Sequence, residues 1–262
     1  MEEKDVGCLG GTEFAMKVIF GGPTLHGEDF PAEAAFHLRP PARQGDIYRV
    51  VQEGANVVGL IDGVYEQVPA VWHKEILFAL SLGVRVYGAA SMGALRAAEC
   101  AVFGMIGLGK IYQDIVTGVV EDDAEVAQSH APAELGFLPL SEPLANVRAT
   151  LALCLEKRLI TKGEHQKLLE LASSIFFKDR TYKSILAAVR DIGPTRSAEL
   201  LALLKANSVN QKLTDARQLI AAVINAPDLR SDPPSSWIFE PTTMWTGFLQ
   251  AECTTDTGPS KP

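Results

Sequence analysis

Three short apolar runs, each bounded by glycine, constrain the fold more than any other feature of the chain. They are residues 16–22 (MKVIFGG), 56–62 (NVVGLID) and 84–90 (VRVYGAA). Runs of this length without polar alternation are typical of strands that are buried on both faces of a parallel sheet. Segments with helical periodicity alternate with them, at residues 47–53, 69–82 and 92–103. The alternation predicts an α/β fold, with a small, mostly parallel sheet and flanking helices.

The pattern changes near residue 136, after which the chain is helical and has almost no clusters of β-branched residues. Five segments there have helical periodicity: 143–158, 161–177, 182–192, 195–205 and 214–225. Thr161, three residues before Glu164, has the spacing of a capping box. We therefore divide the chain into an N-terminal tail (1–15), an α/β core (16–135), an all-helical part (136–226) and a C-terminal tail or arm (227–262).

The C-terminal arm is rich in proline and polar residues, yet it is not featureless. It carries five large apolar side chains: Trp237, Ile238, Phe239, Trp245 and Phe248. We expect these side chains to dock on the body of the protein, with docking on a partner as the alternative.

Composition excludes several classes of protein. With 47% hydrophobic and 21% charged residues, the chain is too apolar to be disordered throughout. No uncharged stretch approaches the roughly 18–20 residues that cross a bilayer. The first residues carry acids and no apolar segment of a secretory signal, so we expect a cytoplasmic protein without a membrane partner. A net charge of −8 without clustered Lys and Arg argues against nucleic acid as a partner.

The cysteines do not indicate a disulfide framework or a metal site. Cys8, Cys100, Cys154 and Cys253 lie far apart in the chain and form no C-x-x-C pair. Such spacing predicts neither a disulfide framework nor a zinc site. We therefore expect no metal and no cofactor.

The segment 85–99 (RVYGAASMGALRAAE) places Ser91 at a turn from a strand to a helix. Its small neighbours would let a carbonyl group approach the hydroxyl closely, and backbone N–H groups at Met92 and Gly93 could stabilise an oxyanion. This arrangement follows the logic of a nucleophile elbow, although the string is not G-x-S-x-G. The alternative is that Ser91 only caps the helix that begins at Met92.

A second feature is the triplet His73-Lys74-Glu75, which interrupts an otherwise apolar helical segment. Consecutive helical residues point about 100° apart, so at least one of the three is expected to face protein. A lysine in an apolar pocket has a lowered pKa, and its neutral amine could take a proton from Ser91. His73 is an alternative base, with Glu75 or Asp62 orienting it. The remaining alternative is an exposed first helical turn.

Further polar groups are expected outside the carboxyl ends of the strands, where open α/β sheets collect their active groups. Gly22 ends the first apolar run and Asp62 ends the second, so we place both near Ser91 as oxyanion- or substrate-binding residues. Arg96, one turn into the helix after Ser91, would bind an anionic substrate end or brace an acid.

An acidic loop follows, made of Glu121, Asp122, Asp123 and Glu125, with His130 shortly after it. The loop lacks the spaced ligands of a calcium site. We therefore predict a partner-binding patch that includes His130, with a solvated acidic turn as the alternative.

Taken in order, these motifs resemble the TfuA-like family over about residues 16–150. The residues that carry the resemblance are Asp62-Gly63, the segment 68–77 (VPAVWHKEIL), the segment 88–99 (GAASMGALRAAE) and the acidic run with His130. The elements Gly22-Pro23-Thr24-Leu25 and Pro40-Pro41-Ala42 fit the beginning of the family pattern.

The resemblance implies a partner protein for YcaO enzymes in the backbone thioamidation of ribosomally made peptides. It implies that the protein hydrolyses the C-terminal thiocarboxylate of a small ThiS-like sulfur carrier, so that sulfide is released beside YcaO. It also implies that the protein enhances the binding of the peptide substrate by YcaO. The family's Ser–Lys catalytic pair points to Ser91 as the nucleophile and Lys74 as the base, with Lys110 in reserve.

On this hypothesis neutral Lys74 deprotonates Ser91, which attacks the thiocarboxylate carbon, and protonation of sulfur by Lys74 or His73 helps sulfide to leave. The rival hypothesis is a non-catalytic adaptor that docks on YcaO and recruits the substrate or the sulfur donor. A weaker one is a small-molecule α/β hydrolase without a protein partner.

Overall fold

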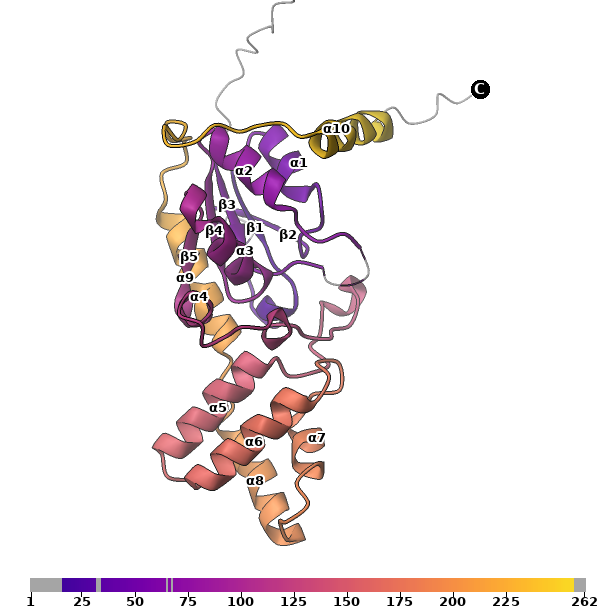
Figure 1. Ribbon diagram of the computed structural model, residues 1–262, viewed down its shortest axis with the longest axis vertical. Coiled ribbons are helices and arrows are strands. Elements are labelled where there is room, and N and C mark those ends of the chain that lie inside the picture. Colours follow the sequence, from indigo (N-terminus) through magenta and orange to yellow (C-terminus); the bar gives the residue numbers. More distant parts are fainter. Residues whose placement is uncertain (1–15, 32–33, 65, 67, 257–262) are drawn as a thin grey trace, which may run out of the picture.

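The computed structural model describes residues 16–31, 34–64, 66 and 68–256, so the expected N-terminal tail (1–15) and Cys8 lie outside the described residues. Five parallel strands form one sheet in the order β2-β1-β3-β4-β5 (Figure 1). They are β1 (Lys17–Phe20), β2 (His37–Arg39), β3 (Val57–Leu60), β4 (Arg85–Ala89) and β5 (Ile106–Leu108). The three apolar runs form the adjacent strands β1, β3 and β4, with Val58 opposite Val18 on one side and Val86 on the other. The α/β fold class is thereby confirmed.

The sequence pattern does not reveal the edge strands β2 and β5. Each is three residues long, and every residue of β2, with the sequence HLR, is exposed. A short edge strand buries too little apolar surface to require a hydrophobic run. The helix that follows β5, α4 (Gly109–Val116), also has no counterpart among the predicted segments.

Helices cover both faces of the sheet. On one face lie α1 (Asp46–Gln52), α2 (His73–Ser81) and α3 (Met92–Cys100), and on the other lies α9 (Gln211–Asn225). Helix α2 begins at His73 rather than near residue 69, with Trp72 as an extended N-cap residue. The triplet of charged residues is therefore the first turn of α2.

A second core, separate from that of the sheet, lies among four helices in the lower half of Figure 1. They are α5 (Leu144–Glu156), α6 (Lys162–Ser174), α7 (Tyr182–Ala187) and α8 (Pro194–Ala206). The capping box at Thr161 and Glu164 is confirmed. Helix α7 ends at Ala187, short of residue 192, and the extended Gly193 is the N-cap of α8, whose first residue is Pro194.

Four single 3₁₀ turns join the described helices and strands: Pro23–Leu25, Ala101–Phe103, Asp123–Glu125 and Ala133–Leu135. None of the helices in the described part of the chain has the length and apolar character that a membrane span requires.

Helix α9 does not stay with the four helices that precede it. Its Leu219 and Val223 are buried in the same cluster as Ile19 of β1 and Val57 of β3. The chain therefore returns from the helical part to the sheet, and α9 also contacts the turn that follows β1. This return brings the first turn of α9 to the carboxyl ends of the strands.

The C-terminal arm crosses α1 and α2 and ends in α10 (Thr243–Asp256) (Figure 1). Trp245 is 2% exposed and packs edge-on against Tyr48 and at a tilt against Phe78. Trp237 donates a hydrogen bond from Nε1 to the Phe103 carbonyl oxygen, at 3.1 Å. The arm therefore docks on the body, as expected. Its Ile238 is an exception, because this side chain is 83% exposed.

Glu75 is the member of the triplet that faces protein, at 1% exposure. Its carboxylate accepts N–H bonds from Trp72 at 2.8 Å, from Gly45 and Ile47 at 3.0 Å, and from Tyr48 at 3.4 Å. One side chain thus accepts hydrogen bonds from backbone N–H groups at the N-termini of both α1 and α2, where a helix leaves its first amides without an intrahelical acceptor. Burial raises the pKa of Glu75 to about 7, against the opposing effect of these N–H groups.

Glu75→Ala should therefore lower the free energy of unfolding by at least about 3 kcal/mol, because several buried N–H groups lose their acceptor together. Urea denaturation followed by circular dichroism measures the loss. Glu53→Ala is the matched control, because within the described residues the Glu53 carboxylate pairs only with Arg39, at an exposed position. Its loss should cost less than about 1 kcal/mol. Equal losses in the two variants would contradict the role of Glu75.

Candidate functional site

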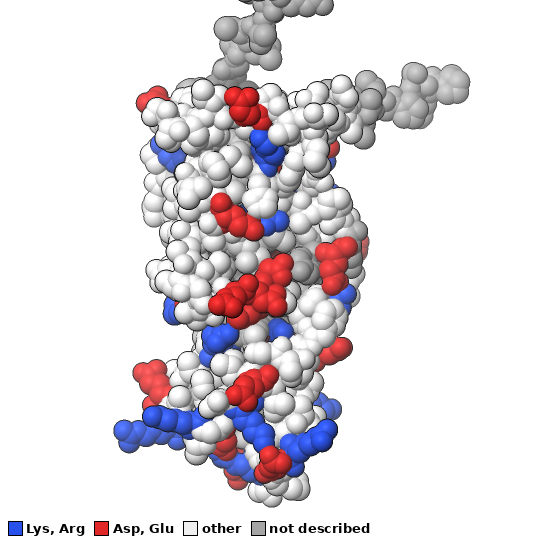
Figure 2. All heavy atoms as spheres, in the orientation of Figure 1, with Lys and Arg blue, Asp and Glu red and all other residues white. Residues whose placement is uncertain are grey.

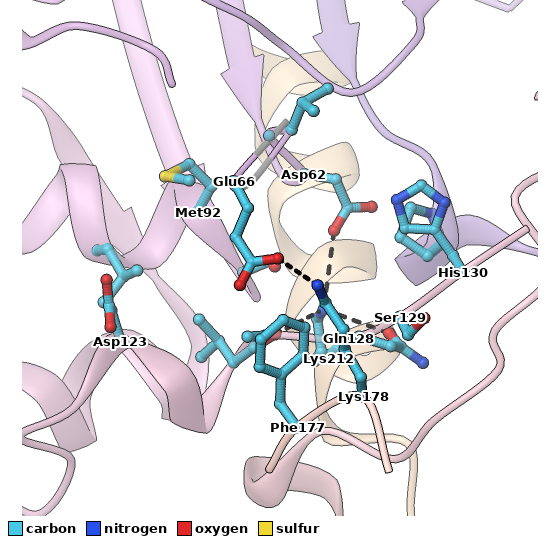
Figure 3. A pocket seen from close by; sticks show the side chains of 17 residues that line it. Asp62, Glu66, Met92, Asp123, Gln128, Ser129, His130, Phe177, Lys178 and Lys212 are labelled. Atoms are coloured by element: carbon cyan, nitrogen blue, oxygen red, sulfur yellow. Dashed lines mark hydrogen bonds and ion pairs between the residues drawn. The ribbon is translucent and has the colours of Figure 1, made fainter. Parts of the chain in front are cut away.

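A cavity of about 130 Å³ lies at the carboxyl ends of the three central strands. Pro23 after β1, Asp62 after β3 and Ser91 after β4 all line it. The expectation that polar groups collect at this edge therefore agrees with the geometry. The remaining walls come from the 123–130 loop, from Phe177 and Lys178 of the helical part, and from Lys212 of α9 (Figure 3).

The turn that presents Ser91 is strained. Ala90 has a φ of 68°, and the Ser91 N–H donates to the Ala89 carbonyl oxygen at 2.7 Å, which closes a three-residue γ-turn. A γ-turn with positive φ at its centre is rare for a residue with a side chain, and such strain clusters at functional sites. Ser91 stands at the N-cap position of α3, but its hydroxyl makes no cap hydrogen bond. The capping alternative thus does not account for this hydroxyl.

The two N–H groups expected to stabilise an oxyanion, those of Met92 and Gly93, differ in whether they already have a hydrogen-bond partner. The Gly93 N–H donates to the Ile61 carbonyl oxygen at 3.1 Å, so it is already committed. A Cβ on Gly93 would lie 1.7 Å from the Leu60 carbonyl oxygen, which makes this glycine a packing requirement between α3 and β3. Its assignment as an oxyanion donor therefore needs correction. The Met92 N–H has no partner among the described residues, and Met92 lines the cavity.

Asp62 organises the neighbouring turn from a buried position, at 2% exposure. It accepts hydrogen bonds from the Gly22 N–H at 2.9 Å, the Thr24 N–H at 3.0 Å and the Thr24 hydroxyl at 2.6 Å. The N–H of Gly22 is consequently occupied, and Gly22 serves the site by fixing the turn after β1. Asp62 itself lines the cavity, as expected of a residue at this edge.

Lys212 is the cation closest to this carboxylate. It is 2% exposed, and its Nζ lies 3.8 Å from Asp62 Oδ1. The ammonium group donates to the Val126 carbonyl oxygen at 3.1 Å and to Gln128 Oε1 at 3.4 Å. Burial lowers the pKa of Lys212, while the charge of Asp62 raises it. The cavity that holds Ser91 thus also holds a buried amine.

A second lysine reaches the cavity from the helical part. Lys178 pairs with Glu66 at 2.5 Å (Figure 3), and both side chains are partly exposed. Lys178 also lies near the rings of Phe176 and Phe177, at 5.6 and 5.5 Å from their centroids. The α/β and helical parts therefore meet across this cavity.

The expected bases lie elsewhere. Lys74 donates to the Glu240 carbonyl oxygen at 2.6 Å and lies 4.8 Å from the Phe239 ring centroid, beneath the C-terminal arm. Lys110 pairs with Asp114 on α4. Neither lysine lines the cavity with Ser91. The apolar pocket expected around Lys74 is instead a half-buried surface site that the arm partly covers.

His73 and Arg96 form a surface cluster with Glu99. His73 Nε2 lies 2.8 Å and Arg96 Nη1 lies 2.7 Å from Glu99 Oε2, and Arg96 Nε donates to the Val71 carbonyl oxygen. Arg96 thus braces an acid, one of its two expected roles. Neither His73 nor Arg96 lines the cavity.

The acidic loop divides into three parts. Glu125 pairs with Arg148 at 2.9 Å and is largely covered. Asp123 and His130 line the Ser91 cavity. Glu121, Asp122 and Asp123 line a shallow neighbouring groove floored by Leu95, Ile115 and Val116. Figure 2 shows acidic side chains gathered on the middle of this face.

Sequence reasoning missed Lys212, although a signal for it exists. The buried positions of α9 are Lys212, Asp215, Ala216, Leu219, Ile220 and Val223. They follow the helical spacing of one face, so the apolar stripe of α9 continues onto two charged residues, Lys212 and Asp215, near its N-terminal end. A charged residue inside an apolar stripe needs a buried partner, and this requirement could have singled out Lys212.

Residues 62–181 match the family model described as TfuA-like protein. The match confirms the resemblance noted from the motifs, and it includes Asp62, Ser91 and His130 but ends before Lys212. No curated protein matches the chain.

The close approach of α3 to β3 gives a test of the site's framework. Gly93→Ala should lower the free energy of unfolding by at least about 3 kcal/mol, because the new Cβ would collide with backbone atoms that cannot move aside. Gly163→Ala on α6 is the matched control, since nothing lies closer than 4.0 Å to its Cβ position. This control should leave stability unchanged or slightly raised. A Gly93→Ala protein with the wild-type melting temperature would refute the packing argument.

Proposed function

We propose that the chain, a TfuA-like protein by its residues 62–181, is the partner of a YcaO enzyme in peptide backbone thioamidation. In this role its cavity hydrolyses the C-terminal thiocarboxylate of a ThiS-like sulfur carrier and releases sulfide, and the protein enhances peptide binding by YcaO. The observation that carries the proposal is the uncapped Ser91 hydroxyl, on a strained turn, in one cavity with the buried amine of Lys212.

Lys212, rather than Lys74, is the base in this mechanism. The base must be neutral to accept the proton of Ser91, and burial favours the neutral amine. Its position is fixed by Val126 and Gln128, which accept its N–H bonds. The Asp62 carboxylate, 3.8 Å away, favours the ammonium that forms after proton transfer.

The first half of the reaction forms an acyl-enzyme. The Ser91 oxygen bonds to the thiocarboxylate carbon as its proton moves to Lys212, and the Met92 N–H stabilises the developing oxyanion. The carbon–sulfur bond then breaks, and the proton passes from Lys212 to the departing sulfur, so that hydrosulfide leaves. The carrier remains as an ester on Ser91, which water must cleave.

The size of the cavity supports a chain end as substrate. At about 130 Å³ it is smaller than the roughly 300–1,000 Å³ of sites that enclose a whole small molecule. A terminal thiocarboxylate would occupy it while the rest of the carrier stayed outside.

The groove beside the cavity favours a second candidate function, that of a non-catalytic adaptor. Its acidic rim of Glu121, Asp122 and Asp123 over an apolar floor is suited to docking a protein. An adaptor would still enhance peptide binding by YcaO, but it would not need the Ser91 hydroxyl.

Removal of either reacting group should abolish hydrolysis of a thiocarboxylated ThiS-like carrier. Ser91→Ala and Lys212→Met are expected to lose at least about 10³-fold in kcat, because the two groups act as one unit. Sulfide release measures the rate, and thermal melting shows whether each variant is folded. Lys74→Ala and Lys110→Ala are the matched controls and should keep near wild-type rates.

The same Ser91→Ala protein separates the two candidate functions. Under the proposed hydrolase, it still stimulates thioamidation by YcaO when inorganic sulfide is supplied, but fails with the carrier as the only sulfur source. Stimulation that is equally strong with both sulfur sources would instead identify an adaptor.

The rate should also depend on pH in a defined direction. Because the reactive form of Lys212 is the neutral amine, kcat/KM rises with pH and levels off above the pKa of Lys212, which burial holds below its ordinary value. Asp62→Asn removes the charge that raises this pKa, so the rising limb should move to lower pH. A pH–rate profile of both proteins measures the shift, and a limb that stays in place or moves upward would exclude Lys212 as the base.

A further inference from the structure

The cavity contains a second nitrogen base, His130, which the acylation steps above do not use. It stands in the loop between two 3₁₀ turns, Asp123–Glu125 and Ala133–Leu135. Figure 3 shows its ring at one side of the cavity, next to Asp62 in that view. The imidazole is partly exposed, whereas Lys212 is 2% exposed. Water can therefore reach His130 from outside more readily than it can reach Lys212.

The backbone around His130 is firmly held. The Ala131 N–H donates to the Leu138 carbonyl oxygen at 2.8 Å, and the Leu140 N–H donates to the Ser129 carbonyl oxygen at 2.8 Å. These two bonds flank an antiparallel bridge between His130 and Pro139. The position of the ring is thus fixed by the fold rather than by a substrate.

Hydrogen bonding also fixes which ring nitrogen is basic. His130 Nδ1 lies 2.8 Å from the Ala131 carbonyl oxygen, which can only accept, so Nδ1 carries the hydrogen. In the neutral ring Nε2 then carries the lone pair. Among the described residues Nε2 has no hydrogen-bond partner, and the ring packs edge-on against Phe137 at 5.7 Å between centroids. This is the arrangement of a histidine poised to take a proton from water.

We infer that His130 is the catalytic base of the second half-reaction, the hydrolysis of the acyl group from Ser91. This inference rests on the proposed function. His130 Nε2 takes a proton from water as the water oxygen bonds to the acyl carbon. The bond from that carbon to the Ser91 oxygen then breaks, and His130 returns its proton to Ser91. The carrier leaves with a C-terminal carboxylic acid, which ionises in water, and no other reactant is consumed.

Each base thus serves one half of the reaction, Lys212 the acylation and His130 the hydrolysis of the ester. Lys212 moves the proton of Ser91 to sulfur during acylation, and it is neutral again once hydrosulfide has left. His130 then handles the proton of water on the more exposed side of the cavity. Loss of His130 should leave acylation intact and stop the enzyme as an ester.

The experiment follows this ester with a ThiS-like carrier protein that has been converted to its C-terminal thiocarboxylate. With His130→Ala, one equivalent of sulfide should appear rapidly, followed by turnover at least about 100-fold slower than wild type. A covalent conjugate of the two proteins should accumulate, visible by denaturing electrophoresis and intact mass, and hydroxylamine should cleave it. Adding Ser91→Ala to His130→Ala should remove the conjugate.

His26→Ala is the matched control. His26 Nδ1 also lies 2.8 Å from a backbone carbonyl oxygen, that of Gly136 in the same loop region, but His26 does not line the cavity. It should turn over without a conjugate, which shows that loosening the loop is not enough. His130→Gln serves as a second variant if His130→Ala melts at a lower temperature than wild type.

Two outcomes would overturn the role of His130: wild-type turnover by both folded His130 variants, or loss of the initial sulfide burst together with turnover. Wild-type sulfide release by Ser91→Ala would instead overturn the proposed function. The two failures are therefore distinguishable within one assay.

Discussion

The buried contact between Asp62 and Lys212 joins the parts of the molecule on which the cavity depends. Asp62 holds the turn after β1 through three hydrogen bonds. Lys212 links α9 to Asp62, and its hydrogen bond to the Val126 carbonyl oxygen links both to the loop that leads to His130. A buried charge without a partner costs several kcal/mol of folding free energy, so replacing either residue alone should destabilise the fold. The edge of the sheet that carries the cavity and the first turn of α9 are thereby one structural unit.

Local sequence was enough to predict the central strands and the turn at Ser91. Strands β1 and β3 are buried on both faces, and β4 is buried except at Arg85 and Tyr87, which are half-buried, so burial accounts for these apolar runs. Ser91 was recognisable because its small neighbours and the following helix are adjacent in the chain. Lys212 was missed: its place in the apolar stripe of α9 marks a residue that needs a buried partner, but that partner, Asp62, is remote in sequence and only the fold identifies it.

The triplet at the start of α2 shows where such reasoning fails. The periodicity correctly required that one of the three charged residues face protein, but it could not say which. Glu75 took the buried position because the amides of two helices converge on it, a tertiary requirement that arises from α1 as much as from α2. Lys74 was left at the surface, where the C-terminal arm supplies a carbonyl oxygen.

The return of α9 also bears on when the site comes into being during synthesis. Ser91 and its turn leave the ribosome early, while the amine that would activate the serine arrives only with one of the last helices. Until α9 docks, the cavity lacks the buried amine of Lys212, and Asp62 has no buried cation. On the proposed function, a chain that lacks α9 is therefore inactive, because the cavity around Ser91 then has no buried amine to accept the proton of the hydroxyl.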